Sequence, residues 1–542
     1  MCCRNAVVAV LSLCYGLILI GCGDAATPGT ASGTSTSTPP DVSTFHNDNL
    51  RSGQNLQETV LTHKNVNVNT FGKIAFLTVD GKVDAQPLFL ANVQMSTGLR
   101  PTLYVATEHG TVFAFDANTA EYLWNSSLLG AGESTSDTRG CDEAIAPEIG
   151  ITATPVIDRT QGPNGAIYVV VMSKDATGNY HQRIHALDIA NGTELFGGPR
   201  EISASYPGTG DNSDGASVVF DSKQYKERAG LLLVNGVIYT TWASHCDVRP
   251  YTGWVLGYDA ATLQQKYVLN LTPNGGGGGI WMSGSGPAAD SAGNIYFLDG
   301  NGTFEDALDA RGFPAQADFG NGFLKLAVTG GLLNVSDYFE MSDEGMENSE
   351  DIDLGSGGSM LLPDVSDAQG KAWHLAVGAG KDGNIYVVNR DSMGKYGQTN
   401  QTLYQEILKP LAGRVFSSPA YFNNTVYYGS ENDTIKAFPI TAAQIAPLPS
   451  STTSSKFPYP GTTPSISANG TNDAILWAVE NGYSATLHAY DATDLTKELY
   501  NSGQAPFQRD QLGPGNKFIT PTVVNGKVYV GTTFGVAVYG LR

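Results

Sequence analysis

Carboxylates are the main candidates for a catalytic or metal-binding role in this sequence. The acidic run 343–353 ends in Asp351 and Asp353, and closely spaced carboxylates can hold a hard cation or act as a base. The same run is also typical of a solvated loop, because like charges repel one another. His245 has no second histidine at ligand spacing, which argues against zinc. The glycine run 275–279 is not followed by the Gly-Lys-Ser/Thr of a phosphate loop, so we expect it only to let the backbone turn tightly.

The two cysteines that belong to the folded part, Cys141 and Cys246, stand far apart in the chain. In an oxidising compartment they could form one disulfide. The alternative is a pair of unrelated buried thiols, and the sequence leaves the choice open because it shows no geometry.

The composition excludes some partners and favours one fold class. The chain has 542 residues with 31 basic and 52 acidic side chains, a net charge of -21. A phosphate backbone or an anionic membrane surface would be repelled, so we expect no nucleic acid as a partner. The 64 glycines, 25 tyrosines and many short Val/Ile/Tyr runs favour one large all-β domain over several mixed ones.

The N-terminus predicts export. Residues 5–20 are an apolar stretch that is short for a membrane span, and residues 19–22 (LIGC) resemble a bacterial lipobox. We therefore predict a signal peptide over residues 1–21, lipidation of Cys22 and a flexible Ser/Thr/Pro/Gly tether over 22–44. An uncleaved anchor is the alternative. The expected location is the cell envelope, as an outer-membrane lipoprotein held by its lipid and facing either the periplasm or the surface.

A unit of four short strands recurs along residues 45–542 and predicts one domain. Its clearest copy reads QPL (86–88), LYVAT (103–107), VFAFDA (112–117) and YLW (122–124). Eight copies follow one another at roughly 40–60 residues, the spacing typical of a β-propeller. The last copy lacks its fourth strand, and the unpartnered segment FGKIAFLTV (71–79) is expected to supply it. Closing the ring in this way would remove exposed sheet edges.

Four of these units resemble the docking repeat A-x-D-x-x-T-G-x-x-x-W of the eight-bladed quinoproteins, the pyrroloquinoline quinone (PQQ) dehydrogenases. They are AFDANTAEYLW (114–124), ALDIANGTELF (186–196), GYDAATLQQKY (257–267) and AYDATDLTKELY (489–500). Residues 51–74 also look like the N-terminal stretch of that family. The resemblance implies an eight-bladed propeller with PQQ and a Ca²⁺ or lanthanide ion at its centre. Related propellers, including outer-membrane assembly lipoproteins, use the same repeat without a cofactor.

Matching the family's site motifs onto this sequence assigns candidate roles. Asp351 and Asp353 in SEDIDL resemble the W-D-Y-D segment of lanthanide-dependent methanol dehydrogenases, and Lys381 in GAGKDGNIYVVNRD matches K-x-G-x-x-Y-V-x-D-R. The resemblance implies Asp351 as catalytic base, with the metal held by Asp247, Asn301, Asp351 and Asp353. It implies cofactor contacts from Asp84, Cys141, Asp142, Trp281 and Lys381. An acid at Asp353 would favour a cation of higher charge than Ca²⁺. Ordinary roles compete with these, such as a turn carboxylate, a core Trp or an Asn-Gly turn.

Three contacts of the family are missing. Gly140 replaces the first of two adjacent cysteines, no arginine follows Cys141 at the matching place, and Val415-Phe416 replaces an asparagine. Cys141 could still cover one face of the quinone or bond to Cys246. These losses argue against tight PQQ binding.

Two functions from different classes follow. The first is an exported oxidoreductase that oxidises an alcohol or sugar with PQQ and a metal ion; it needs a separate electron acceptor, since no C-x-x-C-H haem motif is present. The second is a cofactor-free propeller lipoprotein that binds proteins or glycans. Convergence of Asp247, Asn301, Asp351 and Lys381 on one pocket beside Trp281 would favour the enzyme.

Overall fold

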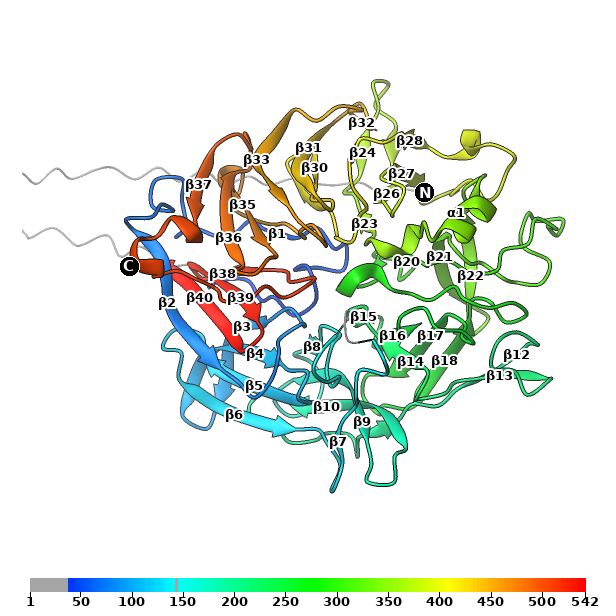
Figure 1. Cartoon of the computed structure of the whole chain (residues 1–542), viewed down its shortest axis with the longest axis horizontal. Helices are drawn as coiled ribbons and strands as arrows, with labels where there is room; N and C mark the ends of the chain where they lie inside the picture. The colour runs from blue at the N-terminus through cyan, green and yellow to red at the C-terminus, as the bar shows by residue number, and fades with distance from the viewer. Residues whose placement is uncertain (1–37, 142–144) are drawn as a thin grey trace, which may run out of the picture. The chain divides into compact units, whose positions relative to one another are not determined.

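The computed structural model describes residues 38–141 and 145–542. The signal peptide, Cys22 and Asp142 lie outside the described residues. Pro39–Arg542 forms one compact unit, and this unit is an eight-bladed β-propeller (Figure 1). Both the fold class and the number of blades predicted from the repeat are confirmed.

Blades 1 to 4 follow the repeat in chain order. Each contains the four antiparallel strands of the repeat with the first strand innermost, and blades 2 and 3 have one additional strand. Blade 1 contains β3 (Leu88–Met95), β4 (Gly98–Ala106), β5 (Thr111–Asp116) and β6 (Tyr122–Ser127). Blade 2 contains β8 (Val156–Asp158), β9 (Ala166–Lys174), β10 (Tyr180–Asp188) and β11 (Arg200–Glu201), with β7 (Ser134–Thr135) also paired to β9. Blade 3 contains β15 (Leu232–Val234), β16 (Val237–Ser244), β17 (Trp254–Asp259) and β18 (Gln265–Asn270), with β14 (Tyr225–Glu227) also paired to β16. Blade 4 contains β19 (Ala288–Ala289), β20 (Ile295–Leu298), β21 (Phe323–Thr329) and β22 (Leu332–Phe339).

Blades 5 to 8 complete the ring. Blade 5 contains β23 (Met360–Leu361), β26 (Leu375–Gly378), β27 (Ile385–Asn389) and β28 (Gln405–Ile407). Blade 6 contains β29 (Ala420–Phe422), β30 (Thr425–Tyr428), β31 (Asp433–Thr441) and β33 (Ser451–Phe457), with β32 (Gln444–Ile445) added to β31. Blade 7 contains β34 (Ser465–Asn469), β35 (Asn472–Glu480), β36 (Thr486–Asp491) and β37 (Glu498–Asn501). Blade 8 contains β38 (Thr522–Val524), β39 (Lys527–Thr532) and β40 (Gly535–Leu541), and its outer strand is β2 (Phe71–Thr78) from the N-terminal part. The predicted closing strand is thus confirmed.

Elements outside the blades are short. They are the hairpins β12 (Ser205–Pro207) with β13 (Ser217–Val219) and β24 (Val365–Ser366) with β25 (Ala372–Trp373), the helix α1 (Glu344–Glu350), and the 3-10 turns Met282–Gly284, Leu354–Ser356, Asn400–Thr402, Ser502–Gln504 and Pro506–Gln508. Among the described residues, no helix has the length and apolar character needed to cross a membrane.

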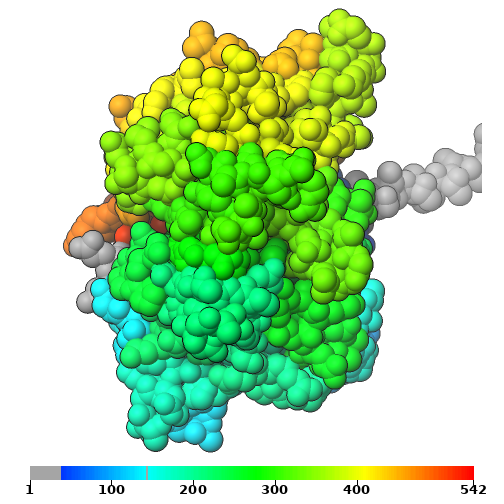
Figure 2. All heavy atoms as spheres, turned by 90° about the vertical axis from the view of Figure 1, so that its right-hand side faces the viewer, coloured from blue at the N-terminus to red at the C-terminus, as the bar shows by residue number. Residues whose placement is uncertain are grey.

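The apolar core is divided among the interfaces between neighbouring blades. One cluster joins blades 2 and 3 and contains Tyr168, Trp242 and Trp254; similar clusters fill the other interfaces. Figure 2 shows the teal, green and yellow blades in contact along one side of the ring. The flat faces of each sheet are therefore buried against the next blade, which explains the apolar strands of the repeat.

Tyrosine hydroxyls join neighbouring blades at the docking repeats. In each case a tyrosine of the second strand donates to the carbonyl that follows the repeat aspartate of the next blade. The bonds are Tyr104 to Ile189 (2.9 Å), Tyr168 to Ala260 (2.6 Å), Tyr427 to Ala492 (2.8 Å) and Tyr529 to Ala117 (3.2 Å). The last of these crosses from blade 8 to blade 1 and strengthens the closure of the ring.

The segment from Val42 to Asn55 bonds to the innermost strand, or the residues just before it, in every blade. Its partners, in order from blade 1 to blade 8, are Phe89, Ile157, Leu233, Ala289, Leu361, Tyr421, Ile466 and Val523. Arg51 is fully buried and donates to the carbonyls of Phe45, Pro287 and Leu231. The expected tether boundary at residue 44 is therefore too late, because Val42 already belongs to the propeller.

Candidate functional site

A cavity of about 500 Å³ lies at one end of the ring. Its walls come from loops that precede the first strand of seven blades and from two loops that join a second strand to a third. Since strand direction alternates within a blade, both kinds of loop meet at the same end. The lining residues are Cys141, Ile145, Ile149, Lys226, Arg228, Ser244, His245, Cys246, Asp247, Trp281, Ser283, Asp351, Asp353, Ser356, Lys381, Phe416, Tyr459 and Phe518. Six of the candidates from the sequence therefore share one cavity: Cys141, Asp247, Trp281, Asp351, Asp353 and Lys381.

Lys381 joins the two aspartates of the S-E-D-I-D-L segment. Its Nζ lies 2.6 Å from Asp351 Oδ1 and 2.7 Å from Asp353 Oδ2. Burial by itself lowers the pKa of Lys381, but the adjoining carboxylates outweigh it and raise the pKa above its usual value. The ammonium is therefore charged at neutral pH and holds both acids on the cavity wall.

Asn301 completes this group from the loop after β20. Its backbone N–H donates to Asp353 Oδ1 (3.0 Å) and its side-chain Nδ2 to Asp351 Oδ1 (3.3 Å). Its Oδ1 is buried and has no hydrogen-bond partner among the described residues. No hydrogen bond from a described residue reaches Asp351 Oδ2. One carboxylate oxygen and one amide oxygen thus remain available for a ligand.

Asp247 lies beside this group in the loop between β16 and β17. It has a left-handed backbone, as does Cys246, and its carboxylate accepts a hydrogen bond from the Tyr251 hydroxyl. Burial raises the pKa of Asp247, and the charges of Asp353 and Asp351 raise it further. Three carboxylates therefore face one ammonium, which leaves this part of the cavity with an excess of negative charge.

Trp281 forms an apolar wall of the cavity, and two glycines make room for it. A Cβ at Gly300 would lie 2.8 Å from Trp281 Cδ1, and one at Gly279 would lie 3.1 Å from Nε1. The predicted role of the glycine run as a tight backbone turn agrees with the left-handed Gly277 and Gly278.

A second aromatic wall consists of Phe416, Tyr459 and Phe518. Neighbouring rings meet edge to face, with centroids 5.3 and 6.5 Å apart. Phe416 occupies the place where the sequence resemblance expected an asparagine, so an aromatic surface replaces a polar contact there.

The structure joins Cys141 to Cys246 in a disulfide with a Cα–Cα distance of 5.7 Å. Both cysteines line the cavity. The bond links the loop before blade 2 to the loop within blade 3, and so restrains the rim of the cavity.

Lys226 and Arg228 are site residues that the sequence reasoning missed. They alternate on the extended segment YKERAG, which contains β14, so they share one face while Glu227 lies on the other. Both are buried and line the cavity. The signal that could have found them is two basic residues at strand spacing directly before the apolar strand LLLV. The arginine missing after Cys141 thus has two cationic substitutes from blade 3.

The prediction that Asp84 contacts the cofactor is not supported, because Asp84 does not line the cavity. Its Oδ2 pairs with Lys82 Nζ at 3.2 Å. Burial raises the pKa of Asp84, but the Lys82 charge and further partners outweigh burial and lower it overall. Asp84 therefore acts as a buried counterion behind the cavity wall.

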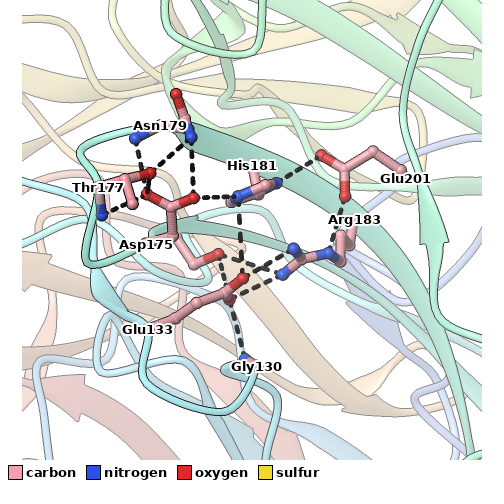
Figure 3. A network of polar contacts seen from close by, with 9 residues as sticks. Gly130, Glu133, Asp175, Thr177, Asn179, His181, Arg183 and Glu201 are labelled. Atoms are coloured by element: carbon pink, nitrogen blue, oxygen red, sulfur yellow. Dashed lines mark hydrogen bonds and ion pairs between the residues drawn. The ribbon is translucent and has the colours of Figure 1, made fainter.

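A separate polar network on blade 2 shows how the protein neutralises charges that have no ligand (Figure 3). Arg183 binds Glu133 through both terminal nitrogens (2.8 Å each) and Glu201 through Nε (2.8 Å). His181 lies 3.0 Å from Glu201 and 3.6 Å from Asp175. The Arg183 hydrogen bonds lower the pKa of Glu133 to about 2. Each of these charged side chains has a partner, which is typical of an ion-pair network with a structural role.

The oxygen atoms around Asp351 are of the type that binds a hard cation. Carboxylate and amide oxygens are the ligands that such ions prefer, Asn301 Oδ1 is an orphaned buried oxygen, and the net charge of the three acids with Lys381 is negative. Among the described residues, no three His, Cys, Asp or Glu side chains stand close enough together to share an ion as placed. Asp247, Asn301, Asp351 and Asp353 are nevertheless the residues that would hold one.

No protein-family model matches the sequence, and neither does any curated protein. Solved structures do match. A quinohemoprotein alcohol dehydrogenase from Comamonas testosteroni aligns at TM-score 0.61 and 13% identity, over 94% of this chain and 81% of the other. One from Pseudomonas putida HK5 aligns at 0.58 and 13%, over 92% and 80%, and a europium-containing methanol dehydrogenase at 0.59 and 14%, over 92% and 98%. At this identity the similarity shows the fold alone. The described chain therefore has the eight-bladed propeller fold of the quinoprotein dehydrogenases.

Proposed function

We propose that the protein is a PQQ- and metal-dependent oxidoreductase that oxidises the CH–OH group of an alcohol or sugar. The observation that carries this proposal is the convergence of Asp247, Trp281, Asp351 and Lys381 on one cavity, with Asn301 bonded to Asp351. A structural channel does not require these groups together, so their convergence favours the enzyme over the cofactor-free scaffold.

Several features support PQQ as the ligand. The volume of the cavity lies within the ordinary range for small-molecule sites, Trp281, Phe416 and Phe518 offer aromatic surfaces, and Lys226, Arg228 and Lys381 offer positive charge for an anion. Amino-acid side chains cannot accept two electrons from an alcohol, and bound PQQ would supply this acceptor. A bound cation would polarise the carbonyl of the quinone. The residues named above would hold both groups.

The chain's own residues would position the substrate and move its proton. Lys381 and Asn301 hold Asp351 Oδ1, so Oδ2 is left to accept the hydroxyl proton of a substrate. Asp351 is 62% exposed in its side chain, whereas Asp353 is 11% exposed. A substrate entering from solvent therefore meets Asp351 first, and Asp353 is placed to stabilise Lys381.

We also propose that the protein is located in the cell envelope. A lipid on Cys22 would anchor the protein in the cell envelope as an outer-membrane lipoprotein, and electrons would pass to a separate acceptor. The net charge of -21 supports the absence of a nucleic-acid partner.

A PQQ titration of the purified protein with Ca²⁺ or La³⁺ tests the function. We expect saturable one-to-one binding that requires the cation, and dye-coupled oxidation of alcohols or sugars that Asp351→Asn abolishes. Asp364→Asn is a matched control, because its side chain is 66% exposed and lies outside the cavity. No PQQ binding with either cation would contradict the enzyme and favour the scaffold.

A further inference from the structure

Lys226 and Arg228 are buried cations whose side chains have no hydrogen-bond or ion-pair partner among the described residues. They are 6% and 9% exposed, and within the described chain neither has a hydrogen bond to its side chain or a carboxylate within ion-pair distance. Other buried cations differ: Arg51 donates to backbone carbonyls, and Lys381 pairs with two aspartates. A buried charge without a partner is costly to the folded state, so a missing anion is the simplest reason for both.

The acids nearby do not neutralise this pair. Asp84 pairs with Lys82, and Glu108 accepts hydrogen bonds from the Thr152 hydroxyl (2.7 Å) and the Gly150 N–H (2.9 Å). Three cations, Lys82, Lys226 and Arg228, therefore face two acids, which leaves the wall positive. In the network on blade 2 (Figure 3), by contrast, Arg183 pairs with both Glu133 and Glu201.

The arrangement suits a carboxylate. The Arg228 guanidinium stacks on Phe518, with its central carbon 4.3 Å from the ring centroid, and this contact leaves its planar edge free for two parallel hydrogen bonds. Lys226 adds a point charge on the same face of the strand. The acids at the other part of the cavity, Asp247, Asp351 and Asp353, would repel an anion and direct it to this wall.

We propose that Lys226 and Arg228 form an anion-binding subsite that receives the carboxylate groups of a small organic polyacid. The assignment of the rest of that ligand rests on the proposed function: the carboxylates belong either to the PQQ cofactor or to an anionic substrate. In either case the subsite orients the ligand so that its reacting part faces Asp351 and Lys381.

Isothermal titration calorimetry with benzene-1,2,4-tricarboxylate, a redox-inert aromatic polyacid, tests the subsite on the purified protein. We expect saturable binding that weakens at least tenfold in Arg228→Gln and in Lys226→Met and partly recovers in Arg228→Lys. Two matched controls should bind as the wild type: Arg249→Gln, since Arg249 pairs with Asp211, and Lys223→Met, which removes an exposed cation from the same segment. Circular dichroism and urea unfolding establish that each variant is folded.

The outcomes separate this proposal from the proposed function. Absence of tricarboxylate binding, or equal binding by the folded variants, overturns the subsite. Tricarboxylate binding that PQQ blocks assigns the carboxylates to the cofactor; binding that persists in PQQ-loaded protein assigns them to a substrate. Tricarboxylate binding without any PQQ binding supports the subsite and contradicts only the quinoprotein function.

Discussion

Replacing Lys226 by methionine should stabilise the protein although it removes a binding residue. Burial and, to a smaller extent, the neighbouring Arg228 charge lower the pKa of Lys226 from 10.5 to about 7, although the charges of Glu108 and Asp84 act in the opposite direction. Such a shift destabilises the folded state by about 4 kcal/mol at pH 7, because folding must desolvate a cation that the unfolded chain keeps in water. Methionine fills a similar volume without the charge.

The stabilisation by Lys226→Met should decrease as the pH rises above 7. The folded protein gives up the Lys226 proton before the unfolded chain does, so the penalty is largest below pH 7 and shrinks as pH rises from 7 towards 10.5. The stabilisation by Lys226→Met should therefore fall from about 4 kcal/mol at pH 7 to about 2 kcal/mol at pH 9. Loss of the cation would disfavour ionised Glu108, but burial and Asp84 already raise the pKa of Glu108 to about 7. Glu108 would take up a proton, which keeps this offset small.

Equilibrium urea unfolding at pH 7 and pH 9, read by tryptophan fluorescence, measures the difference. Lys223→Met is the matched control, since Lys223 is exposed in the same segment and should change stability by less than about 0.5 kcal/mol. This account of Lys226 would be refuted if Lys226→Met were no more stable than the wild type. It would also be refuted if the variant were stabilised equally at both pH values.

Three further predictions concern the site and its support. Asp351→Asn should lower the rate of PQQ-dependent alcohol oxidation, measured at saturating PQQ and cation, by roughly 10²- to 10⁴-fold, the range for loss of a general base; an unaltered rate in steady-state kinetics would exclude Asp351 as the base. Replacing Cys141 and Cys246 by serine opens a link between residues 105 apart and should cost about 2–4 kcal/mol of unfolding free energy, whereas equal urea midpoints would show that the bond restrains little. Arg183→Gln should destabilise the protein at neutral pH, because the stabilisation from the lowered pKa of Glu133, about 2, is present above pH 4.5 and is lost as pH falls through 2. A stability difference that stays the same at pH 7 and pH 2 would count against that ion pair.

Features that depend on local pattern were predictable from the sequence. Each blade repeats strands of similar apolar character, and each docking repeat closes its turn through its own aspartate, as when Asp116 accepts from the N–H groups of Asn118 and Thr119. The unpartnered segment 71–79 and the incomplete last unit together predicted the closure that β2 and β40 make. These signals lie within one or two strands and need no knowledge of the ring.

The site was predictable only in part. Asp247, Trp281, Asp351, Asp353 and Lys381 were found through motif matches and share the cavity. Asp84 matched a cofactor-contacting position of the family by its place along the chain, but its side chain pairs with Lys82 instead. Lys226 and Arg228 matched no motif, and the basic wall that they form comes from blade 3, not from the loop after Cys141.

The number of blades and the strand that closes the ring could be read from the sequence alone, because strand period and docking turns are local properties of the chain. Which side chains meet across the axis depends on the tertiary structure. Closing eight blades brings loops hundreds of residues apart to one end of the ring. The Asp351–Lys381 pair, the Cys141–Cys246 bond and the cations Lys226 and Arg228 therefore line one cavity there. The course of Val42–Asn55 past all eight blades has the same origin, since its hydrogen-bond partners exist only once the ring is closed.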